Sequence, residues 1–103
     1  MIYILNSSIL TDFGVYKYSK ISQEKAKEIL KANTSISAIG HEATAIFLSK
    51  LLDADIKCNR IAIAMSPGDI AIVFRLLTRL KEGEILDNIP PSSYSLGILE
   101  RLE

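Results

Sequence analysis

The chain contains a single histidine, His41, and its position favours acid–base chemistry. His41 follows Gly40 at the start of a predicted helix, where unpaired backbone N–H groups and the positive end of the helix dipole attract an anion. A phosphate bound there would lie beside an imidazole, which titrates near neutral pH and can donate a proton to a leaving oxygen. A lone histidine is also a common cap or packing residue, so the pattern alone leaves both roles open.

Three more charged residues are candidates for phosphate contacts. Arg79 and Glu82 are three positions apart, so their side chains share a face if this turn is helical. Arg60 begins a predicted strand, and a planar guanidinium can hold two phosphate oxygens at once. Each also has a structural explanation, because Arg79 and Glu82 could form an exposed ion pair and Arg60 could prevent edge-to-edge strand pairing.

A polar loop follows the first predicted strand. Asn6, Ser7 and Ser8 come directly after the β-rich segment 2–5. Loops in this position of an α/β sheet often bind ligands. The same residue types also form ordinary turns, so ligand binding and turn formation remain alternatives.

The aromatic residues divide into two groups. Tyr18 and Tyr94 could stack on a nucleobase. The others are predicted to lie in the core, namely Tyr3, Phe13, Tyr16, Phe47 and Phe74.

Two helices are predicted to position these residues. The first covers 22–32 and begins with Ser22, a suitable N-cap, followed by good helix formers. The second and stronger helix runs from His41 to Leu52. Its wide apolar face predicts close packing on a sheet and consists of Ala45, Ile46, Phe47, Leu48, Leu51 and Leu52.

Apolar patterns predict strands at 2–5, around 15–21, at 60–65, at 70–77 and at 96–102. The turn at 66–69 contains Pro67 and Gly68, which predicts that 60–65 and 70–77 pair as a β-hairpin. Together with two helices, these strands predict one α/β domain over residues 1–103, with helices packed on a small mixed sheet.

Composition excludes several classes of protein. The 103 residues are 49% hydrophobic and 23% charged, which is typical of a globular domain. The longest apolar runs are about five residues, too short to span a membrane, and no signal peptide is recognised. One cysteine, Cys58, fits a reducing compartment and, with one histidine, argues against a zinc site. Twelve basic and twelve acidic residues disfavour a non-specific binder of long nucleic acids.

Three short motifs resemble a family of ring nucleases from viruses and bacteria. They are the segment 39–44, Ile-Gly-His-Glu-Ala-Thr, the pair Asn59-Arg60, and the segment 79–83, Arg-Leu-Lys-Glu-Gly. Members of this family degrade cyclic tetra-adenylate and act as type III anti-CRISPR proteins. The resemblance covers nearly the whole chain, and the sequence departs from the family pattern at Glu42-Ala43 and at Cys58.

The resemblance implies specific roles for the candidate residues. His41, after Gly40, occupies the position of the catalytic histidine, and Arg79 and Glu82 occupy positions beside the scissile phosphate. The position of Arg60 implies contact with the ligand. Ligand-binding positions are further implied in the first loop, at Asn6, Ser7 and Ser8.

The implied reaction is metal-independent cleavage of the ring, without a cofactor. The ribose 2′-OH attacks the adjacent phosphate, His41 protonates the departing 5′-oxygen, and linear di-adenylates with a 2′,3′-cyclic phosphate result. A two-fold symmetric homodimer would present one His41 to each of two opposite phosphates of the ring. The expected location is the cytoplasm, that of the host cell if the protein is viral.

Two other functions remain open from the sequence. A non-catalytic cyclic-oligonucleotide binding protein, acting as a sponge or sensor, would share the pocket and release the ring intact. A small structural or protein-interaction subunit would show no saturable nucleotide binding.

Overall fold

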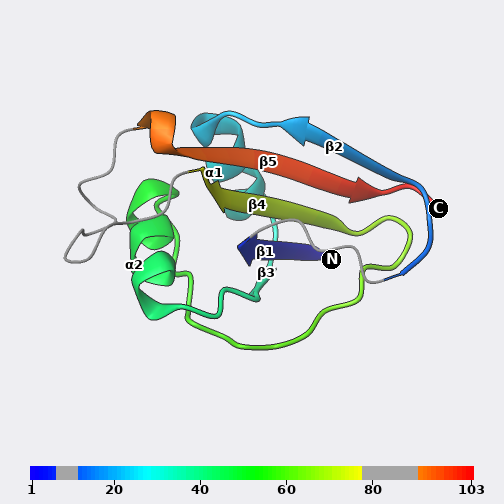
Figure 1. Ribbon diagram of the computed structural model, residues 1–103, viewed down its shortest axis with the longest axis horizontal. Helices are drawn as coiled ribbons and strands as arrows, with labels where there is room; N and C mark the ends of the chain where they lie inside the picture. Colours follow the sequence, from blue (N-terminus) through cyan, green and yellow to red (C-terminus); the bar gives the residue numbers. More distant parts are fainter. Residues whose placement is uncertain (7–11, 78–90) are drawn as a thin grey trace.

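The computed structural model describes residues 1–6, 12–77 and 91–103 of the chain (Figure 1). In this part of the chain, two α-helices are interspersed among five strands. The elements in order are β1 (Ile2–Asn6), β2 (Tyr16–Lys20), α1 (Gln23–Ala32), β3 (Ser35–Ser37), α2 (Glu42–Leu51), β4 (Ile70–Leu76), the short 3-10 helix η2 (Pro91–Ser93) and β5 (Tyr94–Arg101).

The strands form one mixed sheet in the order β2-β5-β4-β1-β3. The central strand β1 pairs in parallel with both β3 and β4, whereas β5 is antiparallel to both β4 and β2. The expected α/β domain with a small mixed sheet and two packed helices is therefore confirmed. The two-fold homodimer stays a prediction.

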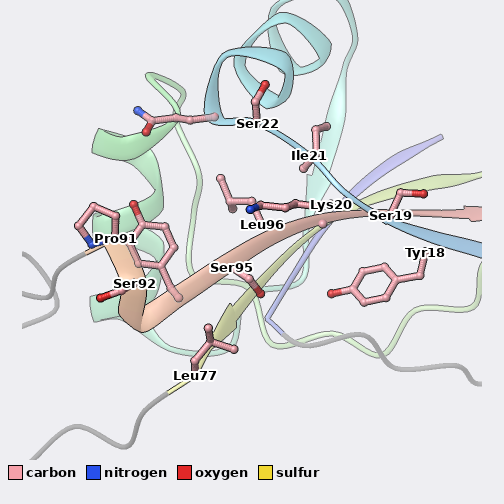
Figure 2. Close-up of a pocket in the computed structure, with 13 residues that line it drawn as sticks. Tyr18, Ser19, Lys20, Ile21, Ser22, Leu77, Pro91, Ser92, Ser95 and Leu96 are labelled. Atoms are coloured by element: carbon pink, nitrogen blue, oxygen red, sulfur yellow. The ribbon is translucent and has the colours of Figure 1, made fainter.

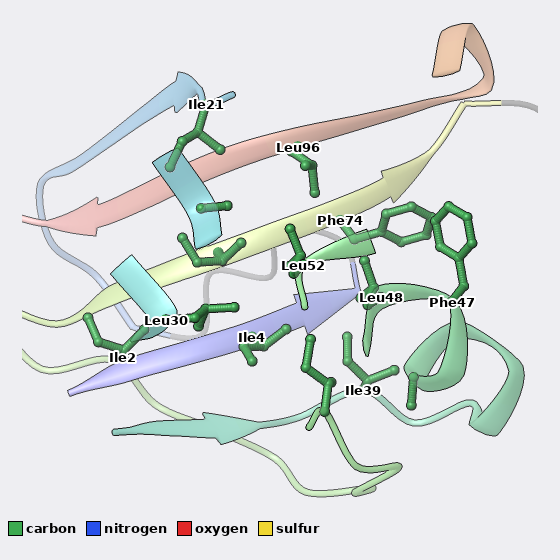
Figure 3. Close-up of a cluster of buried hydrophobic side chains, with 14 residues drawn as sticks. Ile2, Ile4, Ile21, Leu30, Ile39, Phe47, Leu48, Leu52, Phe74 and Leu96 are labelled. Atoms are coloured by element: carbon green, nitrogen blue, oxygen red, sulfur yellow. The ribbon is translucent and has the colours of Figure 1, made fainter. Parts of the chain in front are cut away.

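Both helices pack on one face of the sheet. Ser22 caps α1 as predicted, since its hydroxyl accepts a hydrogen bond from the backbone N–H of Lys25 at 3.1 Å. Leu30 of α1 and Leu48 of α2 meet the apolar side chains of β1 and β4 in the main core (Figure 3). Burial of these apolar surfaces holds α2, and hence its first residues, against the sheet.

The segment 60–65, predicted as a hairpin strand, forms no strand in the structure. The predicted turn is present, because the N–H of Asp69 donates to the carbonyl of Ser66 at 2.9 Å and Gly68 has a φ of +94°. However, β4 pairs with β1 and β5 and not with 60–65. Ile63, which is partly buried, and Met65, which is buried, instead cover the second face of the sheet, whereas Ile61 is exposed.

Two smaller differences concern single elements. The polar segment 33–35, predicted only to end the first helix, leads into the short edge strand β3. Phe13, predicted to lie in the core, is fully exposed in the structure. Within the described residues no helix has the length and apolar character that crossing a membrane requires.

Candidate functional site

The carboxyl ends of three parallel strands define the edge of the sheet where the candidate residues gather. β1 ends at Asn6, β3 at Ser37 and β4 at Leu76. The helix α2 lies at this end of the sheet (Figure 1). Because Ile4 is paired with Ser37, Asn6 lies beside the connection that runs from β3 to Gly40 and His41. Carboxyl ends of parallel strands are a common place for ligand sites in α/β folds.

His41 occupies the N-cap position of α2. Its backbone is extended, with a φ of −125° and a ψ of 127°, and its carbonyl accepts the first helical hydrogen bond, from Ala45, at 3.0 Å. Its imidazole makes no capping hydrogen bond and is exposed. The side chain is therefore accessible to a ligand at the positive end of a ten-residue helix.

Arg60 is joined directly to the residue that precedes His41. Its Nε donates a hydrogen bond to the carbonyl oxygen of Gly40 at 2.7 Å. A Cβ on Gly40 would approach the Cγ of Arg60 to 3.3 Å, so the glycine leaves room for the arginine stem to lie against the backbone. Arg60, a candidate for phosphate contact from the sequence, therefore lies beside the residue that precedes His41, and it does not begin a strand as predicted.

Asn59 anchors the segment that carries Arg60. Its side-chain amide donates to the carbonyl of Ser37 at 2.8 Å, and its backbone N–H donates to the carbonyl of Ile39 at 2.7 Å. Ile39 and Cys58 also form a parallel bridge. In the sequence, Asn59 stands out only as part of the Asn59-Arg60 motif. Its role in holding the two segments together depends on contacts between distant residues, so no local pattern indicates it.

Four predicted site residues lie outside the described residues, namely Ser7, Ser8, Arg79 and Glu82. The described residues that directly precede these segments are Asn6 and Leu77, and both lie at the same edge of the sheet. Of the predicted site, the structure thus brings Gly40, His41 and Arg60 together and places Asn6 at the same edge.

The two candidate stacking tyrosines differ in environment. The Tyr94 ring packs against Phe47 and Phe74, with centroids 5.5 and 5.6 Å apart, and so belongs to the core. Tyr18 lies on β2 with 48% of its surface exposed. Only Tyr18 of this pair offers an open ring.

The described residues contain no group of three or more His, Cys, Asp or Glu side chains suited to a metal ion. None of the residues brought together at the sheet edge is therefore assigned as a metal ligand. Ionisable groups placed there include His41 and Arg60, with Glu42 in the first turn of α2 and Cys58 bridged to Ile39.

Comparison with known proteins places the chain in a family. A model of the family described as STIV B116-like matches residues 2–89. The chain belongs to the STIV B116-like family. The solved structure of B116 of Sulfolobus turreted icosahedral virus has the same fold, with a TM-score of 0.81 over 97% of this chain and 98% of that chain, at 24% sequence identity.

Proteins with clear sequence similarity to this chain include viral proteins and a bacterial protein. "Uncharacterized protein 26" of Sulfolobus islandicus filamentous virus is 40% identical over 93 residues, which cover 86% of this chain and 79% of the relative. "Uncharacterized protein YddF" of Bacillus subtilis is 36% identical over 103 residues, covering 96% of this chain and 95% of the relative. Proteins similar to this chain thus occur both in a virus of Sulfolobus and in a bacterium.

Proposed function

We propose that this protein is a metal-independent ring nuclease that cleaves cyclic tetra-adenylate and thereby switches off type III CRISPR signalling. The observation that carries the proposal is the exposed imidazole of His41 at the N-terminus of α2, beside a glycine whose carbonyl is held by Arg60. This arrangement offers an acid, a cation and unpaired helix N–H groups to one phosphate.

In the proposed reaction the RNA supplies its own nucleophile. The ribose 2′-hydroxyl gives up its proton, to Glu82 or to solvent, and its oxygen forms a bond to the adjacent phosphorus while the bond from phosphorus to the 5′-oxygen breaks. His41 gives its proton to the departing 5′-oxygen, a contribution worth about 10²–10⁴-fold in rate. Two such cleavages at opposite phosphates convert the ring into two linear di-adenylates that end in a 2′,3′-cyclic phosphate.

Arg60 has two roles in this proposal. The hydrogen bond from its Nε fixes Gly40, and we assign the two terminal nitrogens of its guanidinium to phosphate oxygens. Asn6 lies at the carboxyl end of the neighbouring strand β1. We assign further ligand contacts to Ser7 and Ser8, and stabilisation of charge on the phosphoryl oxygens to Arg79. Glu82 is assigned either to the orientation of Arg79 or His41 or to acceptance of the 2′-OH proton.

The chain has one histidine, yet two cleavages are needed to open the ring into halves. A two-fold symmetric homodimer answers this requirement, since each protomer would bring one His41 to opposite phosphates. The ligand carries only four phosphates, so a few placed cations suffice although the chain has no net charge. The proposed place of action is the cytoplasm of the cell that makes the cyclic nucleotide.

The experiment is incubation of the purified full chain with labelled cyclic tetra-adenylate in the presence of EDTA. We expect linear di-adenylates with a 2′,3′-cyclic phosphate, identified by mass spectrometry. Quantitative recovery of the intact ring after saturable binding would instead establish a sponge or sensor. Absence of both cleavage and binding would favour a structural or protein-interaction subunit.

A further inference from the structure

A cavity of about 700 Å³ lies where β2 leaves the sheet. β2 ends at Lys20, which is paired with Gly97 of β5, and the chain then turns into α1. The first three residues of β5, 94–96, therefore have no partner in β2. In Figure 2 the side chains surround the resulting space, with Pro91 and Ser92 on one side and Tyr18 and Ser19 on the other.

Tyr18 provides an open aromatic surface at this cavity. A Cβ added to Gly97 would lie 2.5 Å from the Cε1 and 2.9 Å from the Cζ of Tyr18, so the ring rests directly over the glycine backbone. Gly97 is buried, whereas Tyr18 keeps 48% of its surface exposed. Because Gly97 has no side chain, one face of the Tyr18 ring can pack on the backbone at position 97. The other face stays open for stacking.

Lys20 gives the cavity its charge. It is the only charged side chain among the described residues that line the space. Hydroxyl groups come from Ser19, Ser22, Ser92 and Ser95, and an amide from Gln23. The apolar part of the lining includes Leu77 and Leu96. A space with an apolar wall, one open ring, one ammonium group and a few hydroxyls is typical of a small-ligand site.

We propose that this cavity binds a planar aromatic ligand that carries one anionic group, such as a nucleoside monophosphate. The planar part stacks on Tyr18, the anion pairs with Lys20, and hydroxyl groups of the ligand face Ser92 and Ser95. A volume of about 700 Å³ is within the usual range for such ligands. The proposal goes beyond the nuclease function, because none of the described residues lining the cavity belongs to the site around His41.

Titration of the full chain with AMP, followed by amide NMR shifts and calorimetry, tests the proposal. Adenosine, which lacks the anion, and inorganic phosphate, which lacks the ring, are the comparison ligands. We expect saturable AMP binding with shifts at residues 18–20 and 95–97, and binding of each comparison ligand at least about tenfold weaker. No saturable binding of AMP, or shifts confined to Gly40, His41 and Arg60, would overturn the proposal.

Matched variants separate the two sites. Tyr18→Ala is expected to weaken AMP binding about tenfold, and Tyr18→Phe to retain it, because the ring alone provides stacking. Lys20→Ala should weaken binding about fivefold and reduce its salt dependence. Lys17→Ala, an exposed lysine on the same strand outside the cavity lining, should change it less than about twofold.

Gly97→Ala supplies a second probe of the stacking surface, since the added methyl group displaces the Tyr18 ring. His41→Ala and Arg60→Ala are expected to keep AMP binding unchanged whether or not the chain cleaves cyclic tetra-adenylate. Loss of AMP binding in those two variants, or unaltered binding in both Tyr18→Ala and Lys20→Ala, would contradict the assignment.

Discussion

The Nε of Arg60 donates a hydrogen bond of 2.7 Å to the carbonyl oxygen of Gly40, immediately before His41. This bond connects the segment that follows α2 to the segment that begins it. An arginine has five N–H donors, so the bond leaves the terminal nitrogens of the guanidinium for a ligand. In the proposed reaction, one side chain would therefore both hold the backbone next to His41 and contact the phosphate.

Replacement of Arg60 separates these two roles. Arg60→Lys retains a positive charge but loses the planar fork, so we expect ligand binding to be largely kept while the cleavage rate constant falls about tenfold. Arg60→Ala should weaken both. Single-turnover cleavage and equilibrium binding of cyclic tetra-adenylate measure the two effects. Lys57→Ala, an exposed cation three residues earlier, is the control and should match the wild type.

Gly40→Ala tests the contact from the other partner. A Cβ at this position would lie 3.3 Å from the Cγ of Arg60, so the arginine stem must move by a few tenths of an ångström. We expect cleavage to fall about threefold to tenfold in the wild-type background, through a weakened hydrogen bond. In the Arg60→Ala background the same change should have little further effect. Additive losses in this double-mutant cycle would show that the two residues act independently.

Asn59 is expected to contribute to stability through its side-chain amide. Asn59→Ala leaves the carbonyl of Ser37 without its 2.8 Å donor, which should cost about 1 kcal/mol of unfolding free energy. A loss of this size corresponds to a decrease in Tm of about 4–8 °C for a domain of this length. Asn59→Asp should be at least as destabilising, because a carboxylate cannot donate this bond.

Asn33→Ala is the matched control for Asn59. The Asn33 amide also donates to a backbone carbonyl, that of Ile29 at 2.9 Å, but at the exposed end of α1. Asn33→Ala should leave the cleavage rate unchanged, whereas Asn59→Ala should lower the cleavage rate, because the segment that carries Arg60 is held less firmly. Equal cleavage by both variants would mean that the Asn59 contacts do not position the site.

The two helices could be predicted because their signals are local. Ser22 forms the expected cap, and the apolar face of α2 packs on the sheet as its spacing indicates. The position of His41 at the start of α2 follows from the same local pattern. The short strand β3 could not be predicted, because its three residues Ser-Ile-Ser are held by pairing with β1 and not by their own propensity.

The incorrect prediction that 60–65 and 70–77 pair as a hairpin has a different cause. Apolar alternation from Arg60 to Met65 is typical of a strand, but it also occurs in a segment that covers a sheet face with only some of its side chains, here Ile63 and Met65. The contact between Arg60 and Gly40 joins residues 20 positions apart, so the sequence suggested the two residues but not their bond. Phe13 was misplaced because an aromatic residue near a strand is normally, but not here, buried.

Packing of α2 on the sheet should dominate stability. Leu48 is completely buried in the main core, so Leu48→Ala is expected to lower the unfolding free energy by about 2–5 kcal/mol. Ile46 lies on the same helix with 49% of its surface exposed, and Ile46→Ala should cost less than about 0.5 kcal/mol. Urea unfolding measures both variants. Similar losses for the two would indicate that α2 does not pack on the sheet as described.

The most direct test of the nuclease account is the His41→Ala variant under single-turnover conditions, with excess protein, cyclic tetra-adenylate and EDTA. Removal of the acid at the N-terminus of α2 is expected to lower the cleavage rate constant by about 10²-fold or more, while the affinity for the ring changes by only a few fold. Cleavage by His41→Ala at the wild-type rate would contradict the account.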